Sequence, residues 1–335
     1  MWQWRQSQSN EWQNYSDIET AIIEDVYNRH GNRVELEDNV VVDLKQGLQM
    51  NNANKKKNEK AVEIRRLSTD CDDAETFRNR RQRNDRFCSA PQMEQNTNAN
   101  SSLGAANWNG SQFVFEWQMK CPNLESLSYG DIMRQALEGI RQEGREIGLE
   151  KQAQWIVDHF MPVTKESFEN ICRACLRLYT MEGFVYRVLN TTLRDNNLSK
   201  IDTLGPLCYL LFQFNFAPEL QNLCYTGRVY RSAELTPAMV SEYKQAIGSV
   251  RSWLGLTSTS RQQQIAESFP RSTVLFIIDI RNTASDAARA IANLSTYPHE
   301  DEVLIRAGRH FTIDKVESTE SSNSNINTLI YLTIE

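Results

Sequence analysis

The chain has 335 residues, of which 40% are hydrophobic and 24% are charged, and its formal net charge is −6. These values are typical of a globular protein, and the length predicts two or three domains. The negative charge argues against nucleic-acid binding through bulk electrostatics, and no apolar run is long enough to span a membrane. The seven cysteines are scattered, which favours reduced thiols over disulfides. Because the polar N-terminus lacks the apolar core of a signal peptide, we expect an intracellular protein, cytoplasmic or nuclear.

Residues 1–70 predict a separate small domain. Aromatic side chains crowd its start, and residues 18–30 have the apolar spacing of an amphipathic helix. Residues 39–44 and 60–67 are expected to be strands, separated by a polar loop over 51–58 that holds three consecutive lysines.

This pattern is similar to the WWE domain, a small half-barrel with one helix. The resemblance is carried by Trp4, Trp12, Tyr15, Glu24, Tyr27, Gln49 and the Ile-Arg-Arg triplet at 64–66. Members of that family bind the iso-ADP-ribose unit of poly(ADP-ribose), and the resemblance implies Tyr15, Gln49 and Arg65 as ligand residues. Val40 stands where ligand-binding members tend to have tyrosine. We therefore expect the fold to be kept and ADP-ribose binding to be weak or absent.

Residues 71–112 predict a flexible linker. Residues 95–104 are a run of Asn, Ser, Thr and Ala with no core pattern. The arginines within residues 76–87 are Arg78, Arg80, Arg81, Arg83 and Arg86. Such a run is most often exposed to solvent. The alternative is a nuclear localisation signal or a contact site for a polyanion.

Residues 124–222 predict a helical lobe. Apolar spacing indicates one helix over 130–160 that ends at Pro162, another over 165–179 with Thr164 as its N-cap, and a third over 202–216. Cys172 and Cys175 share one helix face. Because there is no second cysteine pair and no histidine at ligand spacing, we interpret them as buried thiols and expect no metal site.

After about residue 225 the hydrophobic period changes toward two. Strands are expected at 227–232, 253–258, 274–280, 302–305, 310–316 and 329–335, with a helix over 241–252. Residues 113–335 therefore predict one α+β domain, in which the helical lobe is followed by a mostly antiparallel β-sandwich over 225–335.

Three short motifs lie on or beside these strands. Arg231 belongs to Val-Tyr-Arg-Ser at 229–232, Ser258 begins Ser-Thr-Ser at 258–260, and Glu300 and Glu302 flank Asp301 before Val-Leu-Ile. In an extended segment alternate side chains share a face, so we expect both glutamates to reach into one cleft while Asp301 points away. A guanidinium is suited to phosphate, and a carboxylate stabilises a developing positive charge.

In this order the motifs resemble the Arg-Ser-Glu class of mono-ADP-ribosyltransferases, shared by cholera-type toxins and animal ecto-enzymes. The resemblance extends over roughly residues 167–335. It implies the ADP-ribosyltransferase fold, NAD as substrate and no metal. The site residues that it implies are Arg231, Ser258, Glu300 and Glu302 for catalysis, Arg231, Ser258, Thr259, Ser260 and Phe269 for NAD binding, and Tyr297 and Glu300 for positioning the acceptor. For Phe269 and Tyr297, packing in the core or on the sheet remains the alternative.

The glutamate two residues before the catalytic one resembles that of the arginine-modifying enzymes, because a protonated guanidinium needs a carboxylate to orient it and to take its proton. We therefore expect transfer of ADP-ribose from NAD to arginine side chains of proteins, with release of nicotinamide. Two alternatives stay open: an NAD glycohydrolase, and a binding protein that acts through the WWE domain. The expected partners are NAD, an arginine-containing acceptor protein and, through the WWE domain, ADP-ribose or an ADP-ribosylated protein.

Overall fold

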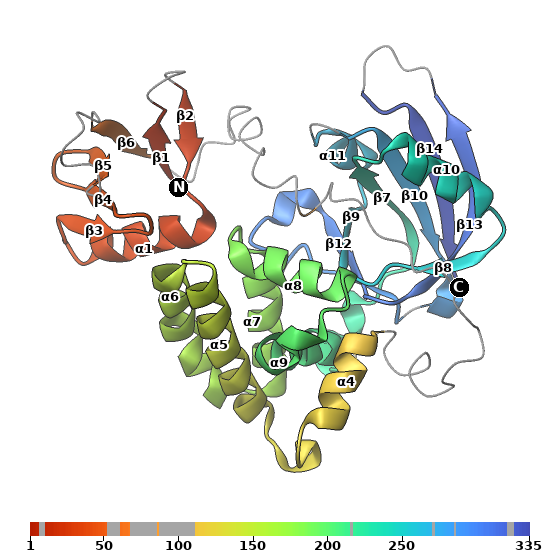
Figure 1. The fold of residues 1–335 in the computed structure, drawn as a ribbon, viewed down its shortest axis with the longest axis horizontal. Coiled ribbons are helices and arrows are strands. Elements are labelled where there is room, and N and C mark those ends of the chain that lie inside the picture. Colours follow the sequence, from red (N-terminus) through yellow and green to blue (C-terminus); the bar gives the residue numbers. More distant parts are fainter. Residues whose placement is uncertain are drawn as a thin grey trace.

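The computed structural model describes residues 1–6, 11–51, 61–67, 86, 111–214, 217–269, 272–284, 286–319 and 325–335. Of the expected arginine-rich stretch only Arg86 is described, and the run 95–104, most of the loop over 51–58 and the end of the helix expected over 202–216 lie outside these residues. Three parts follow one another along the chain: a small β-domain, a helical lobe and a β-lobe (Figure 1). No helix in the described ranges combines the length and apolarity needed to cross a membrane.

The N-terminal part is a six-stranded antiparallel sheet with one helix, α1, packed on it. The strands run in the order β2-β1-β6-β5-β4-β3. Their bounds are β1 Trp2–Arg5, β2 Trp12–Asn14, β3 Arg33–Glu35, β4 Val40–Asp43, β5 Leu48–Asn51 and β6 Val62–Arg66. Helix α1, Asp17–Asn28, begins at a capping box made by Ser16 and Glu19, which satisfies two of the N–H groups at its start. The expected helix and both expected strands are confirmed within two residues of their bounds.

The helical lobe is built around a central helix, α9, which packs against three others. The helices are α4 Gln112–Lys120, α5 Tyr129–Glu146, α6 Glu150–Phe160, α7 Phe168–Thr180, α8 Phe184–Arg194 and α9 Ile201–Gln213. The single helix predicted over 130–160 is wrong, because Gly148 adopts a φ of 75° and separates α5 from α6. Thr164 is also not the N-cap of α7: it lies in a 3-10 turn, and Ser167 accepts the N–H of Asn170 instead.

The β-lobe is one eight-stranded sheet in the order β11-β12-β9-β7-β10-β14-β13-β8. Its elements are β7 Gly227–Ala233, α10 Pro237–Gln245, β8 Val250–Ser252, β9 Thr257–Ser260, α11 Gln263–Glu267, β10 Val274–Ile280, β11 Ala288–Ala290, β12 Glu302–Ile305, β13 His310–Ser318 and β14 Thr328–Ile334. All strand pairs are antiparallel except β10–β14. The pairing of β7 with β9 is confined to Tyr230 and Ser260. Apolar side chains from strands on both sides of this junction, among them β10 and β12, pack in one hydrophobic core.

The bounds predicted for β10 and β12 are confirmed, whereas the region between β7 and β9 differs from the prediction. The helix expected over 241–252 ends at Gln245, since Gly248 has a φ of 81° and the chain then enters β8. The strand expected over 253–258 begins only at Thr257. Trp253 directly follows β8 and is buried against Phe276 and Phe311, so its apolar character reflects core packing.

The N-terminal domain contacts the helical lobe beside α6 (Figure 1). The first turn of α6 has no side-chain cap of its own. Glu37 of the N-terminal domain accepts the backbone N–H groups of Lys151 at 2.5 Å and Gln152 at 3.0 Å. A carboxylate at a helix N-terminus satisfies unpaired donors and interacts favourably with the helix dipole. Trp155 Nε1 also donates to Asp25 of α1 at 2.8 Å, so polar contacts fix the two parts together.

We predict that Gly139→Ala destabilises the helical lobe. A Cβ at Gly139 would lie 1.8 Å from the carbonyl oxygen of Thr203 in α9, so α5 and α9 would have to move apart. Overpacking of this kind costs about 1–3 kcal/mol or more in the free energy of unfolding. Denaturant unfolding measures this cost, with Gln135→Ala on the exposed face of α5 as the control, expected to change it by less than about 0.5 kcal/mol. Equal stability of the two variants would contradict the close approach of these helices.

Candidate active site

The carboxylate Glu302 is the first residue of β12, and its pairing with β9 decides which residues lie beside it. Glu302 is directly opposite Ser260, and Leu304 is opposite Ser258. Opposite residues of an antiparallel pair share a face, as do alternate residues of one strand. Ser258, Ser260 and Glu302 therefore face the same side, and all three are buried.

Arg231 lies on β7, next to the single point at which β7 meets β9. Its side chain is 4% exposed. Nη1 donates to the backbone oxygen of Ser258 at 2.9 Å and to that of Arg86 at 3.0 Å. The structure thus brings the predicted arginine and serine together, although the contact is with the serine's backbone rather than its hydroxyl.

Glu300 reaches the same site by a different route from the one predicted. The segment is not extended: Glu300 ends a 3-10 turn over Pro298–Glu300, and Asp301 adopts the left-handed region with a φ of 50°. Alternation along a strand therefore does not explain the arrangement. Glu300 nevertheless lies near Glu302, since Ser260, the residue opposite Glu302, donates its hydroxyl to the backbone oxygen of Glu300, and both glutamates are 0% exposed. Asp301 binds Arg261 through its Oδ1 at 2.7 Å from Nε.

Thr259 and Ser260 brace the strand that carries the carboxylates. Thr259 Oγ1 donates to the backbone oxygen of Val303 at 2.6 Å. Ser260 Oγ donates to that of Glu300 at 2.7 Å and accepts the N–H of Gln262 at 3.1 Å. These hydroxyls, predicted to bind NAD, are thus placed on the backbone around the two glutamates and hold their positions.

Arg86 is the site residue that the sequence patterns did not single out. Its guanidinium donates from Nη2 to Glu302 Oε2, from Nε to Ser258 Oγ at 3.3 Å and from Nη1 to the backbone oxygen of Thr180 at 2.9 Å. Although burial alone would lower its pKa, the negative charges of Glu302 and Glu300 raise the pKa of Arg86. The sequence offers one signal for this contact, the arginine-rich run over residues 76–87 in a chain that also carries the Glu300–Glu302 pair. Runs of this kind are too common to identify a specific ion pair.

The end of α7 forms the helical side of the site. The ring of Tyr179 lies 5.5 Å from the Arg86 guanidinium carbon, and its hydroxyl accepts from Asn190 Nδ2 at 2.8 Å. Burial raises the pKa of Tyr179, so its hydroxyl stays protonated as a donor. Thr180 Oγ1 accepts the N–H of Thr296 at 3.1 Å and so ties α7 to the loop before Glu300.

The two aromatic residues predicted for the site make contacts of different kinds. The Tyr297 hydroxyl donates to Asp17 of α1, and Asp17 also accepts the N–H of Glu182 at 2.6 Å. Phe269 is 2% exposed and packs against Ile265. Tyr297 therefore joins the loop before the carboxylates to the N-terminal domain, and Phe269 contributes to local packing.

In the N-terminal domain the three residues predicted to bind ADP-ribose engage other side chains. The hydroxyl of Tyr15 donates to Gln49 Oε1, and Arg65 Nε donates to Gln3 Oε1 at 2.7 Å. The guanidinium of Arg65 lies 4.2 Å from the centroid of the Trp12 ring. Tyr15 and Gln49 form one pair and Arg65 belongs to another, so a ligand would have to compete with these contacts.

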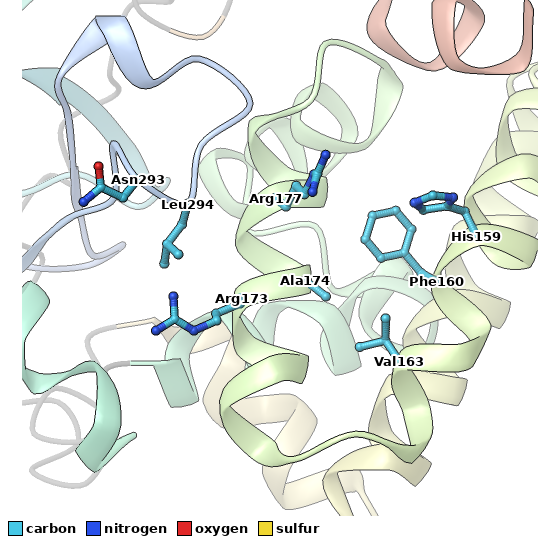
Figure 2. Close-up of a pocket in the computed structure, with 8 residues that line it drawn as sticks. All are labelled: His159, Phe160, Val163, Arg173, Ala174, Arg177, Asn293 and Leu294. Atoms are coloured by element: carbon cyan, nitrogen blue, oxygen red, sulfur yellow. The ribbon is translucent and has the colours of Figure 1, made fainter. Parts of the chain in front are cut away.

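A hollow of about 310 Å³ lies beside the loop that leads to Glu300. Figure 2 shows side chains of α6 and α7 on its helical side and two residues of that loop opposite them. The lining residues are His159, Phe160, Val163, Arg173, Ala174, Arg177, Asn293 and Leu294. None of them belongs to the Arg231–Ser258–Glu302 cluster. Among the described residues no group of three or more metal-ligating side chains is found.

The cluster fits NAD chemically. A guanidinium, Arg231, is suited to the pyrophosphate, and a buried carboxylate, Glu302, is suited to the positive charge that develops on the ribose when nicotinamide leaves. A carboxylate removed from water interacts more strongly with such a charge than an exposed one does.

Comparisons with known proteins give the family of each part of the chain. The model of the NAD:arginine ADP-ribosyltransferase family matches residues 121–329, and that of the WWE domain matches residues 1–66. The type III effector XopAI from Xanthomonas axonopodis pv. citri is 18% identical, with 67% of this chain and 91% of that chain covered and a TM-score of 0.47. The ADP-ribosyltransferase HopU1 of Pseudomonas syringae pv. tomato is 17% identical, with 67% and 97% covered and a TM-score of 0.42. No curated protein sequence matches the chain.

We predict that Tyr297→Phe weakens the attachment of the Glu300 loop to the N-terminal domain. The variant loses the hydrogen bond to the Asp17 carboxylate, and a bond to a charged group contributes about 1.5–3 kcal/mol to the free energy of unfolding. The control is Tyr225→Phe, whose hydroxyl donates at 3.1 Å to the neutral carbonyl of Arg228. Chemical denaturation should show the larger loss for Tyr297→Phe; a smaller loss than that of Tyr225→Phe would exclude the Asp17 contact.

Proposed function

Because the chain belongs to the NAD:arginine ADP-ribosyltransferase family, we propose that it moves ADP-ribose from NAD to arginine side chains of an acceptor protein. One observation carries the choice of arginine. Glu300 and Glu302 are both without solvent exposure; Glu302 binds a guanidinium, that of Arg86, and the charges of both carboxylates raise the pKa of Arg86. The site thus has the charge and geometry to hold this functional group, which a site that activates only water does not need.

In the proposed mechanism, Glu302 stabilises the oxocarbenium-like ribose as nicotinamide leaves. Its Oε1 is buried and has no hydrogen-bond partner among the described residues, so it is available to a ligand. Arg231 would bind the phosphates of NAD, and the hydroxyl of Ser258 would contact the ribose beside Glu302. With these roles the chain would be a member of the Arg-Ser-Glu class.

Glu300 would act on the acceptor. A guanidinium is a poor nucleophile while protonated, so the carboxylate must orient it and draw off its proton as the new bond forms. The proton leaves the attacking nitrogen, the C–N bond to nicotinamide breaks, and the new C–N bond joins ADP-ribose to arginine. With these roles, hydrolysis of NAD needs Glu302 but not Glu300.

The proposed organisation is a WWE domain over residues 1–70, a linker over 71–112 and the transferase domain over 113–335. The WWE domain would contact an ADP-ribosylated partner weakly, if at all, because Val40 replaces the tyrosine of ligand-binding members. The family match to residues 1–66 supports the domain assignment.

The two glutamates should separate transfer from hydrolysis. Glu302→Gln retains size and removes the charge, so both activities should fall by about 10²-fold or more. Glu300→Gln should abolish labelling of arginine while leaving slow hydrolysis of NAD. Nicotinamide release and incorporation of labelled ADP-ribose into an arginine acceptor are measured in parallel.

The matched control for this pair is Asp301→Asn. Asp301 lies between the two glutamates but pairs with the partly exposed Arg261, so both rates should stay close to those of the parent. If Glu300→Gln labels arginine at the parent rate, arginine specificity does not depend on this residue and the proposed acceptor chemistry is wrong.

Arg231→Lys should weaken NAD binding by about tenfold or more, since a charge-assisted hydrogen bond contributes about 1.5–3 kcal/mol and one ammonium cannot reproduce a bidentate fork. Calorimetric titration of NAD measures the dissociation constant. Arg228→Lys is the control, because Arg228 lies on the same strand and pairs with Asp279 at 2.8 Å outside the site. Equal affinity of both variants would place Arg231 outside the phosphate site.

A further inference from the structure

Arg86 lies inside the candidate active site although it belongs to a segment that the sequence predicts to be a linker. It is 5% exposed, whereas arginine is one of the residues least often fully buried. Its three guanidinium contacts, to Glu302, Ser258 and Thr180, come from β12, β9 and the end of α7. Both lobes of the transferase domain therefore take part in holding one side chain.

The contacts of Arg86 use the groups assigned above to NAD. Its guanidinium binds Glu302 and the hydroxyl of Ser258, the proposed ribose contacts. Its backbone oxygen accepts from Arg231 Nη1 at 3.0 Å, the proposed phosphate contact. Arg231 Nη1 already donates to two carbonyl oxygens, those of Arg86 and Ser258, so it cannot serve a phosphate in the same geometry, and NAD would have to share Glu302 and Ser258 with the Arg86 guanidinium. Arg86 and NAD therefore exclude one another from this site.

The surroundings of Arg86 stabilise its guanidinium in the candidate active site. A buried carboxylate requires a cationic or hydrogen-bonding partner, and Glu302 obtains one from Arg86. The Tyr179 ring lies 5.5 Å from the guanidinium carbon and adds a cation–π contact. Because Arg86 belongs to the same chain as the site, its effective concentration there is about millimolar, as for other tethered ligands.

We propose that Arg86 is an internal ligand of the NAD site: the site binds an arginine side chain of its own chain, and this arginine must leave before NAD enters. The proposal rests on the assignment of Arg231, Ser258 and Glu302 to NAD. The enzyme then inhibits itself, because only molecules in which Arg86 has left the site can bind NAD. The apparent affinity for NAD is lowered in proportion to the fraction of such molecules. This arrangement also gives the site a second ligand class: an arginine-containing peptide that binds Glu302 as Arg86 does would compete with NAD, whereas an acceptor arginine held by Glu300 would not.

The test is the affinity of the full chain for NAD, measured by calorimetry with the parent and Arg86→Gln. If the arginine occupies the site in nine molecules of ten or more, Arg86→Gln should bind NAD about tenfold more tightly or better. Arg228→Gln removes one positive charge from an exposed pair on β7 and should leave the affinity unchanged. Arg86→Lys keeps a cation near Glu302 without the guanidinium fork and should show a smaller gain in the same direction.

Removing Arg86 also leaves a buried carboxylate, so stability is followed in parallel by thermal unfolding. Should Arg86→Gln fail to fold, Arg86→Lys serves as the host for a second measurement. A synthetic peptide with the sequence of residues 81–91 should weaken NAD binding to this host competitively, and the same peptide with Gln at position 86 should not.

Unchanged NAD affinity in a folded Arg86→Gln or Arg86→Lys variant, or equal effects of the two peptides, would overturn the internal-ligand proposal. These outcomes are separable from failure of the proposed function, which is read from nicotinamide release and arginine labelling. Tighter NAD binding by Arg86→Gln without transfer to arginine would support the internal ligand and reject the transferase assignment. If Arg86→Gln transfers ADP-ribose to arginine but binds NAD with the affinity of the parent, the transferase assignment is supported and the internal ligand is rejected.

Discussion

Two carboxylates without solvent exposure, Glu300 and Glu302, impose the main constraint on this structure. A charge removed from water is tolerated only when other groups replace its hydration. The structure meets this requirement with a guanidinium that comes from 216 residues earlier in the chain than Glu302. The same requirement makes the site suitable for a cationic ribose or an arginine acceptor, because each would restore the missing positive charge. In the two proposals, restraint by Arg86 and catalysis would therefore depend on the same buried negative charge.

The fold places these carboxylates where both lobes can supply partners. β9 contributes the hydroxyl of Ser260 to the backbone of Glu300, and α7 ends at Thr180, whose oxygens contact Arg86 and the loop before Glu300. The junction of β7 and β9 at a single residue pair brings Arg231 to the backbone of Ser258. Loss of any one of these contacts would loosen the site without removing a reacting group.

The local sequence predicted the strand bounds and motif residues that depend only on nearby side chains. The apolar runs of β10 and β12 gave their bounds, and the motifs identified residues that converge around one site. Three errors had non-local or conformational causes: Gly148 breaks a periodic helix, Trp253 is apolar because it fills the core, and Asp301 leaves the extended region. The position of Arg86 was not predictable, since a buried arginine and a solvated one have the same local sequence.

The N-terminal domain is connected to the candidate active site by side-chain contacts. Asp17, the first residue of α1, accepts hydrogen bonds from Glu182 and from Tyr297 in the loop before Glu300. Tyr15, a candidate ADP-ribose contact, lies two residues earlier and binds Gln49. A ligand that displaced the Tyr15–Gln49 pair would act next to the start of α1. One physical route between the two candidate sites therefore runs from Tyr15 through Asp17 to Tyr297, and from there along three residues to Glu300.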